Sequence, residues 1–139
     1  MTRIQFLHDA PDRIAAAAEW LRQAWAMRRP VLVYVPAREA ADQLDRLLWT
    51  QPATGFVPHC SAESSLAAET PIVLADRLDA LPHDGCLLNL ADELPPGFSR
   101  FEELVEIVST HDRDRLPARD RFKFYRERGY AIEARSIAA

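Results

Sequence analysis

An uninterrupted apolar run at residues 31–35, Val-Leu-Val-Tyr-Val, constrains the fold more than any other feature of the chain. Such a run is typical of a strand that is buried on both faces, as strands are in a parallel sheet. An alternating segment at residues 3–8 precedes it, and apolar side chains recur at helical spacing over residues 12–27 and 37–50. The order strand, helix, strand, helix therefore predicts an α/β fold, a Rossmann-like three-layer arrangement around a mostly parallel central sheet.

The rest of the chain adds short strands and one long helix. With 139 residues, the chain has the length of one ordinary domain, and we expect a single α/β domain over residues 1–139. Residues 51–70 contain prolines and a glycine and are expected to be irregular. The remaining predicted elements are strands at residues 72–75, 86–90 and 130–137, a strand at the end of residues 101–108 (which also fit a helix), and a helix over residues 113–128 that Gly129 terminates.

The residues that nucleotide or metal chemistry would need are missing from the expected places. Phosphate binding in a doubly wound fold uses glycines between the first strand and the first helix, but residues 8–12 read His-Asp-Ala-Pro-Asp. The four histidines show no metal-ligand spacing and are expected on the surface or in loops, and the paired acids at 92–93 and 102–103 are expected to be solvated. We therefore expect no catalytic site, no cofactor and no metal.

The compartment follows from similar reasoning. No stretch approaches the roughly 20 apolar residues of a membrane helix, and no export signal is recognisable at the start of the sequence. Cys60 and Cys86 are too few for a disulfide framework, so we expect two free thiols. These features predict a cytoplasmic protein with no membrane partner.

The charge is distributed unevenly along the chain. The formal net charge is −4, which argues against a dedicated DNA-binding protein because such proteins are usually basic. Residues 1–111 carry 9 basic and 16 acidic side chains, whereas residues 112–139 carry 8 basic and 5 acidic ones. An acidic protein therefore has a local cationic end.

The predicted last helix concentrates this positive charge on one face. At 100° per residue, four cations and one aromatic ring fall within an arc of about 100°, whereas Leu116, Phe124 and Tyr125 fall elsewhere and are expected to serve the core. Such a stripe suits an anionic ligand with a hydrophobic end, for example an acidic peptide with a free terminal carboxylate. Nucleic acid and a merely solvated charged face are the alternatives. The stripe consists of Arg115, Arg119, Phe122, Lys123 and Arg126.

A second candidate surface follows the predicted second helix. Trp49 ends this helix, and Phe56 lies in a proline-flanked loop with Pro52 and Val57. Aromatic side chains in a short, rigid loop resemble the anchors of protein interfaces. The alternative, equally open from the pattern alone, is that both rings fold back onto the edge of the sheet.

Two segments together resemble one known family. Residues 44–59 contain a Leu-Trp pair, then a proline, then Phe-Val-Pro-His, and this pattern is similar to the helix-to-loop segment of the chi subunit family of bacterial DNA polymerase III. Residues 118–126, followed by Gly129, resemble the C-terminal helix of the same family, and the order of elements agrees over nearly the whole chain. The resemblance implies a Rossmann-like fold without a nucleotide site and a place in the clamp-loader assembly during DNA replication.

The resemblance also implies partners for the stripe. Chi proteins link the clamp-loader assembly to single-stranded DNA-binding protein by holding the acidic tail of that protein, which ends in phenylalanine, so the association with single-stranded DNA is indirect. Arg119 would pair with the terminal carboxylate of the tail, Arg115 and Lys123 would attract its acidic residues, and Phe122 would pack near its phenylalanine. The family more often has tyrosine where Phe122 stands. A direct nucleic-acid-binding module is the alternative function.

The second surface matches the region of the family that contacts the psi subunit. The resemblance carries this role to Trp49, Pro52, Phe56 and Val57. In some relatives the same surface meets an accessory helicase. The family provides no catalytic residues of its own, so the chain is expected to be a non-catalytic subunit of a DNA-directed DNA polymerase complex.

Overall fold

A computed structural model describes residues 1–50, 58–62, 64, 70–78 and 84–137. Within these residues the chain forms seven strands, three α-helices and one 3-10 helix. Their bounds are β1 Arg3–Ala10, α1 Arg13–Ala26, β2 Val31–Tyr34, α2 Arg38–Thr50, β3 His59–Ser61, β4 Ile72–Ala75, β5 Cys86–Asn89, η2 Phe98–Arg100, β6 Glu103–Ser109, α3 Asp112–Glu127 and β7 Ile132–Ser136.

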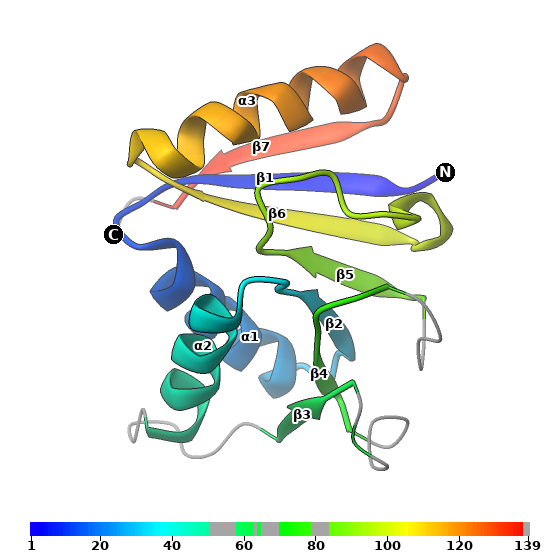
Figure 1. The fold of residues 1–139 in the computed structure, drawn as a ribbon. Helices are drawn as coiled ribbons and strands as arrows, with labels where there is room; N and C mark the ends of the chain where they lie inside the picture. Colours follow the sequence, from blue (N-terminus) through cyan, green and yellow to red (C-terminus); the bar gives the residue numbers. More distant parts are fainter. Residues whose placement is uncertain (51–57, 63, 65–69, 79–83, 138–139) are drawn as a thin grey trace.

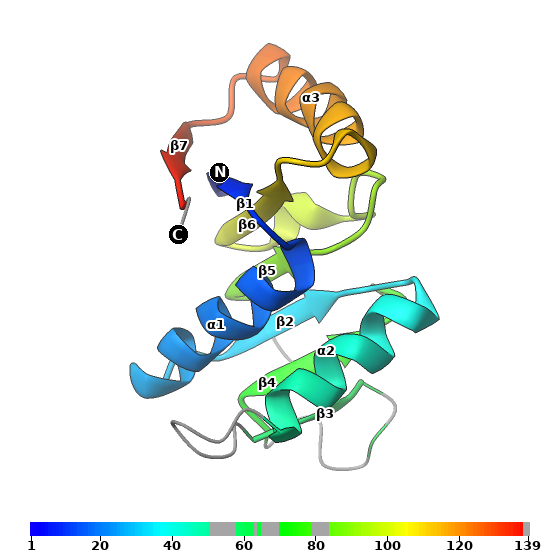
Figure 2. The same cartoon turned by 90° about the vertical axis from the view of Figure 1, so that its left-hand side faces the viewer.

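All seven strands belong to one sheet in the order β3-β4-β2-β5-β6-β1-β7, and every neighbouring pair is parallel. Helices α1 and α2 cover one face, and α3 lies on the other face above β1, β6 and β7 (Figures 1 and 2). The predicted α/β class and the Rossmann-like three-layer arrangement are thus confirmed, with a sheet that is parallel throughout its described strands.

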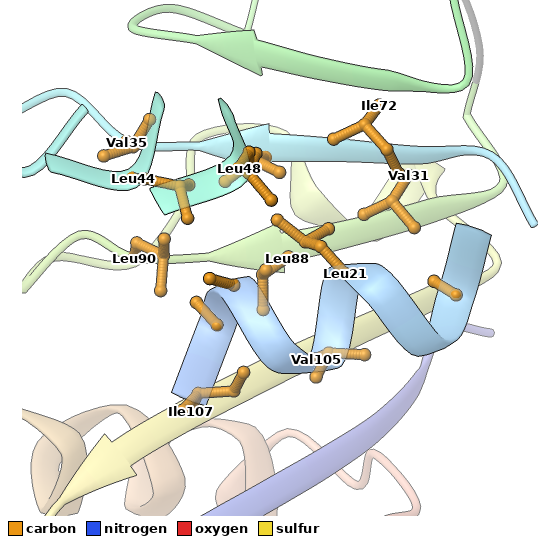
Figure 3. Packing of buried hydrophobic residues seen from close by; sticks show 14 of the residues in the cluster. Leu21, Val31, Val35, Leu44, Leu48, Ile72, Leu88, Leu90, Val105 and Ile107 are labelled. Carbon is orange, nitrogen blue, oxygen red and sulfur yellow. The ribbon is translucent and has the colours of Figure 1, made fainter. Parts of the chain in front are cut away.

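The core beneath α1 and α2 is aliphatic. Leu21 of α1 and Leu44 and Leu48 of α2 are fully buried against the central strands (Figure 3). All four residues of β2 are buried, as the apolar run at residues 31–35 predicted. The β2 strand lies between β4 and β5 in the middle of the sheet, so neither of its faces meets water.

The core beneath α3 is aromatic. Tyr125 of α3 is completely buried, and its ring centroid lies 5.2 Å from that of Phe98 and 6.0 Å from that of Phe6. Both contacts are edge-to-face, the arrangement that aromatic quadrupoles favour. Rings from β1, η2 and α3 therefore fix the height and tilt of α3 on the sheet.

Several expectations about single segments need correction. The stretch at residues 51–70, expected to be irregular, contains strand β3. By contrast, the strand expected at the end of residues 101–108 is confirmed as part of β6. Leu116, expected in the core, is 49 % exposed. The paired acids at 92–93 and 102–103 were all expected to be solvated, but Glu103 is buried and forms an ion pair with Arg29.

The ends of the helices follow their local sequence signals. The Asp12 side chain accepts a hydrogen bond of 3.0 Å from the Ala15 amide and caps α1. Gly129 follows α3 with a φ of 83°, a left-handed conformation that glycine adopts without steric cost. Among the described helices, none is long and apolar enough to cross a membrane.

Candidate functional site

Helix α3 is held on the sheet by a buried ionic network. Glu106 of β6 is inaccessible to solvent, and its carboxylate pairs in a bidentate manner with Arg121, at 3.0 and 3.1 Å. The Tyr125 hydroxyl donates to Glu106 at 2.8 Å, and the Asn89 amide donates at 3.0 and 3.1 Å. Because Arg121 and Tyr125 belong to α3, this network sets which face of the helix meets the sheet.

The network affects the ionisation of its own members. Burial, followed by the charge of Glu106, raises the pKa of Tyr125 far above its ordinary value. The tyrosine therefore keeps its proton and remains a donor. Removing one partner of a buried, hydrogen-bonded ion pair leaves an uncompensated charge, which is strongly unfavourable.

The cationic stripe of Arg115, Arg119, Phe122, Lys123 and Arg126 lies beside this buried face and is open to solvent. Its four cations are exposed, and Phe122 is half-buried. The Phe122 ring packs edge-on against Phe6 of β1, with centroids 5.1 Å apart, and the Arg126 guanidinium lies 5.9 Å from the Phe122 centroid. Arg115 also pairs with Asp112 at 2.6 Å.

A small apolar hollow opens at the N-terminal half of the stripe, between α3 and the sheet. Its volume is about 260 Å³. Two cations of the stripe stand among otherwise mostly apolar lining groups, so the hollow offers an apolar site next to positive charge. The lining residues are Phe6, His8, Val108, Arg115, Ala118, Arg119, Phe122 and Ala134.

The structure therefore brings together three of the five predicted stripe residues at one hollow, Arg115, Arg119 and Phe122, while Lys123 and Arg126 continue along α3. The sequence reasoning missed the lining residues from β1, β6 and β7. Only the strand order could have revealed these residues, because β6 and β7 flank β1 directly under α3.

A larger crevice of about 730 Å³ lies at the carboxyl ends of the central strands, where doubly wound folds usually bind ligands. Arg13 is a buried lining residue of this crevice and donates to the carbonyl oxygens of Ile107 at 2.7 Å and Ala91 at 3.0 Å. Burial lowers the pKa of Arg13 from its ordinary value. The Arg13 guanidinium is already bonded to carbonyl oxygens, and carboxylates such as Asp92 and Glu93 outnumber arginines in the lining, so this crevice is unfavourable for a phosphate.

The second predicted surface is described only in part. Trp49 is 60 % exposed, and its ring lies 5.8 Å from that of His59. His59 was expected on the surface or in a loop, yet it begins strand β3, and its side chain is only 1 % exposed and donates to Asp45 at 2.7 Å. Pro52, Phe56 and Val57 lie outside the described residues.

Neither cysteine forms a disulfide, in agreement with the expectation of free thiols. Within the described part of the chain, no group of three or more histidine, cysteine, aspartate or glutamate side chains is arranged to hold a metal ion.

Comparisons with known proteins agree with the family resemblance found in the sequence. The model of the family described as DNA polymerase III chi subunit, HolC, matches residues 1–133. The DNA polymerase III subunit chi of Pseudomonas aeruginosa is 31 % identical over 137 residues, which cover 96 % of this chain and 95 % of the relative. The proteins of the same name from Escherichia coli and Haemophilus influenzae are 28 % identical over 111 residues and 25 % identical over 115 residues, covering 79 % and 81 % of this chain and 76 % and 79 % of the relatives.

Proposed function

Because the chain belongs to the DNA polymerase III chi subunit family, which provides an accessory, non-catalytic subunit of the replicative polymerase, we propose that it tethers that polymerase to single-stranded DNA-binding protein. The ligand is the acidic C-terminal tail of that protein. The observation that carries the proposal is the apolar hollow with Arg115 and Arg119 at its side, on a stripe of exposed cations. Because the replicative polymerase copies DNA in the bacterial cytoplasm, the chain would be located there.

The chemistry of the hollow suits the end of such a tail. An aromatic side chain can enter the apolar space beside Phe6 and Phe122, where burial of its surface contributes about 25 cal/mol per Å². The terminal carboxylate then lies near Arg119, and a guanidinium binds a carboxylate through two parallel hydrogen bonds. Lys123 and Arg126 extend the positive charge along α3 toward the preceding acidic residues.

A labelled acidic peptide ending in Ile-Pro-Phe tests this assignment by fluorescence anisotropy. Arg119→Ala should weaken binding by about 2–3 kcal/mol, because a charge-assisted hydrogen-bonded pair is lost. Arg128→Ala is the matched control, since Arg128 is also exposed but follows α3 and lies over Phe124, away from the hollow. A peptide with an amidated C-terminus should lose a similar amount of affinity on the unmodified protein.

Equal binding by the unmodified protein and Arg119→Ala would remove Arg119 from the site. Binding should also weaken as salt rises, because exposed charges are screened. If the peptide fails to bind and an oligonucleotide binds with a steep salt dependence, the chain is a direct nucleic-acid binder instead.

We further infer that Trp49, with the neighbouring residues Pro52, Phe56 and Val57, docks the psi subunit or, in its place, an accessory helicase. The support is the exposed indole at the end of α2, because large exposed aromatic side chains are frequent interface anchors. The chain would thus have two peptide-binding surfaces and hold the polymerase assembly at one of them.

A further inference from the structure

Strand β1 is irregular where it borders the hollow. Its register with β6 is regular from Arg3 to Leu7 and then shifts before Ala10, so His8 and Asp9 form a bulge. Asp9 has a φ of 67°, a left-handed conformation that residues other than glycine adopt only at some steric cost. Strained bulges of this kind often redirect a side chain toward a functional site.

The redirected side chain is His8. It lines the hollow together with Arg115 and Arg119, and it is 41 % exposed. Its Nδ1–H donates to the Asp9 carboxylate at 2.9 Å, which orients the ring and leaves Nε2 for a ligand, since no described residue bonds to that atom.

The charged groups around His8 come from two elements. The Asp9 carboxylate of β1 bonds to the ring, Arg115 and Arg119 of α3 line the hollow with it, and Asp112 pairs with Arg115 at 2.6 Å. The facing side chains of β6 and β7, Val108 and Ala134, are uncharged.

We propose that His8 is a further ligand-binding residue of the hollow, where its protonated ring contacts the anionic end of the bound peptide and makes peptide affinity rise as the pH falls. This inference rests on the proposed function of the hollow. With a neutral ring, the His8–Asp9 pair carries one negative charge beside the site and repels an acidic peptide. With a protonated ring, the pair is neutral, and Nε2–H becomes a second donor. Because a bound anion favours the protonated ring, binding takes up a proton.

The experiment is a titration of the labelled acidic peptide at about pH 8 and at about pH 5.5, a range that spans the usual protonation of an exposed imidazole and leaves the peptide carboxylates ionised. The unmodified protein should bind about 3- to 10-fold more tightly at the lower pH, the effect of one added charged hydrogen bond. His8→Gln should bind as the unmodified protein does at about pH 8 and show little change with pH.

Two further variants separate His8 from other causes. Asp9→Asn should bind more tightly than the unmodified protein at about pH 8, because it removes the repelling charge, and asparagine tolerates a positive φ. His111→Gln, at the N-terminus of α3, should keep the full pH dependence.

Two outcomes contradict different claims. If the unmodified protein binds the peptide without pH dependence, or if His8→Gln retains that dependence, His8 is not a ligand-binding residue and the proposed function stands. If the unmodified protein fails to bind at either pH, the proposed function itself fails.

Discussion

A few charged side chains inside the protein decide how α3 lies on the sheet. Glu106 of β6 and Arg121 of α3 are both buried and pair with each other through two hydrogen bonds. Removing one partner of such a pair leaves an uncompensated charge in a region of low dielectric constant. The stripe is therefore positioned by side chains that are buried between α3 and the sheet.

Glu106→Ala should lower the free energy of unfolding by about 3–5 kcal/mol, because Arg121 would remain buried without its carboxylate. Urea denaturation of the two proteins measures the difference. The double variant Glu106→Leu with Arg121→Met should recover much of the loss, since it removes both charges. A small loss for Glu106→Ala alone would mean that Arg121 reaches water when unpaired.

The two thiols should differ in reactivity. Burial raises the pKa of Cys86 from 9.0 to about 11, whereas Cys60 is only partly buried. At about pH 8, a thiol reagent should therefore modify Cys60 first and reach Cys86 only in denaturant. Equal rates in the folded protein would contradict the burial of Cys86.

The same shift predicts how stability changes with pH. The unfolded chain loses the Cys86 proton near pH 9, whereas the folded chain holds it until about 11. The contribution of Cys86 to the free energy of unfolding is fully present below pH 9. It declines as the pH rises toward 11, because the unfolded state then binds fewer protons than the folded one. Urea midpoints measured across this range should fall, and less steeply in Cys86→Ala.

At the scale of the element, α3 combines an exposed cationic face with a buried aromatic face in a single helix. Its end is defined by Gly129, whose φ of 83° lets the chain turn back toward β7. A Cβ atom at this position would meet no neighbour within 4 Å. Glycine is therefore needed for the positive φ of the backbone and not to avoid a clash with neighbouring atoms.

Gly129→Ala should lower the free energy of unfolding by about 1 kcal/mol, because alanine is unfavourable at a positive φ. Gly85→Ala is the matched control, since a Cβ there also meets open space while the backbone has no positive φ. Thermal or urea denaturation of both variants measures the free energy of unfolding. An equal decrease in the two variants would contradict the conformational explanation.

At the scale of the whole molecule, the two proposed surfaces lie at opposite edges of the sheet. The hollow lies beside β1 and β7, whereas Trp49 lies next to β3 at the other end of the strand order. Partners bound at these two proposed surfaces would therefore not overlap.

Trp49→Ala should therefore leave the affinity for the acidic peptide unchanged while weakening psi binding. The combination of Trp49→Ala with Arg119→Ala should show additive effects, because distant sites without shared partners usually do not couple. Isothermal titration with each partner provides the measurement. Loss of peptide affinity in Trp49→Ala alone would indicate that the sites communicate or that Trp49 supports the fold.

Local sequence determined the class of the fold and which side chains share one face of a helix. The apolar run at residues 31–35 specified a strand with two buried faces, and helical spacing placed Arg115, Arg119 and Phe122 on one side of α3, because both depend only on the periodicity of neighbouring residues. The same local reasoning placed Leu116 in the core, where it does not lie, because periodicity gives the angle of a residue on a helix but not the position of the sheet.

Only the tertiary structure decided what the stripe faces. Residues about 100 positions apart in the chain meet at the hollow because the strand order sets β1 between β6 and β7, and no local pattern encodes that order. Glu106 likewise looks like an ordinary strand carboxylate until the fold brings Arg121 and Tyr125 over it. The sequence alone therefore placed the stripe residues on one face of a helix, and long-range packing decided which of them line the hollow.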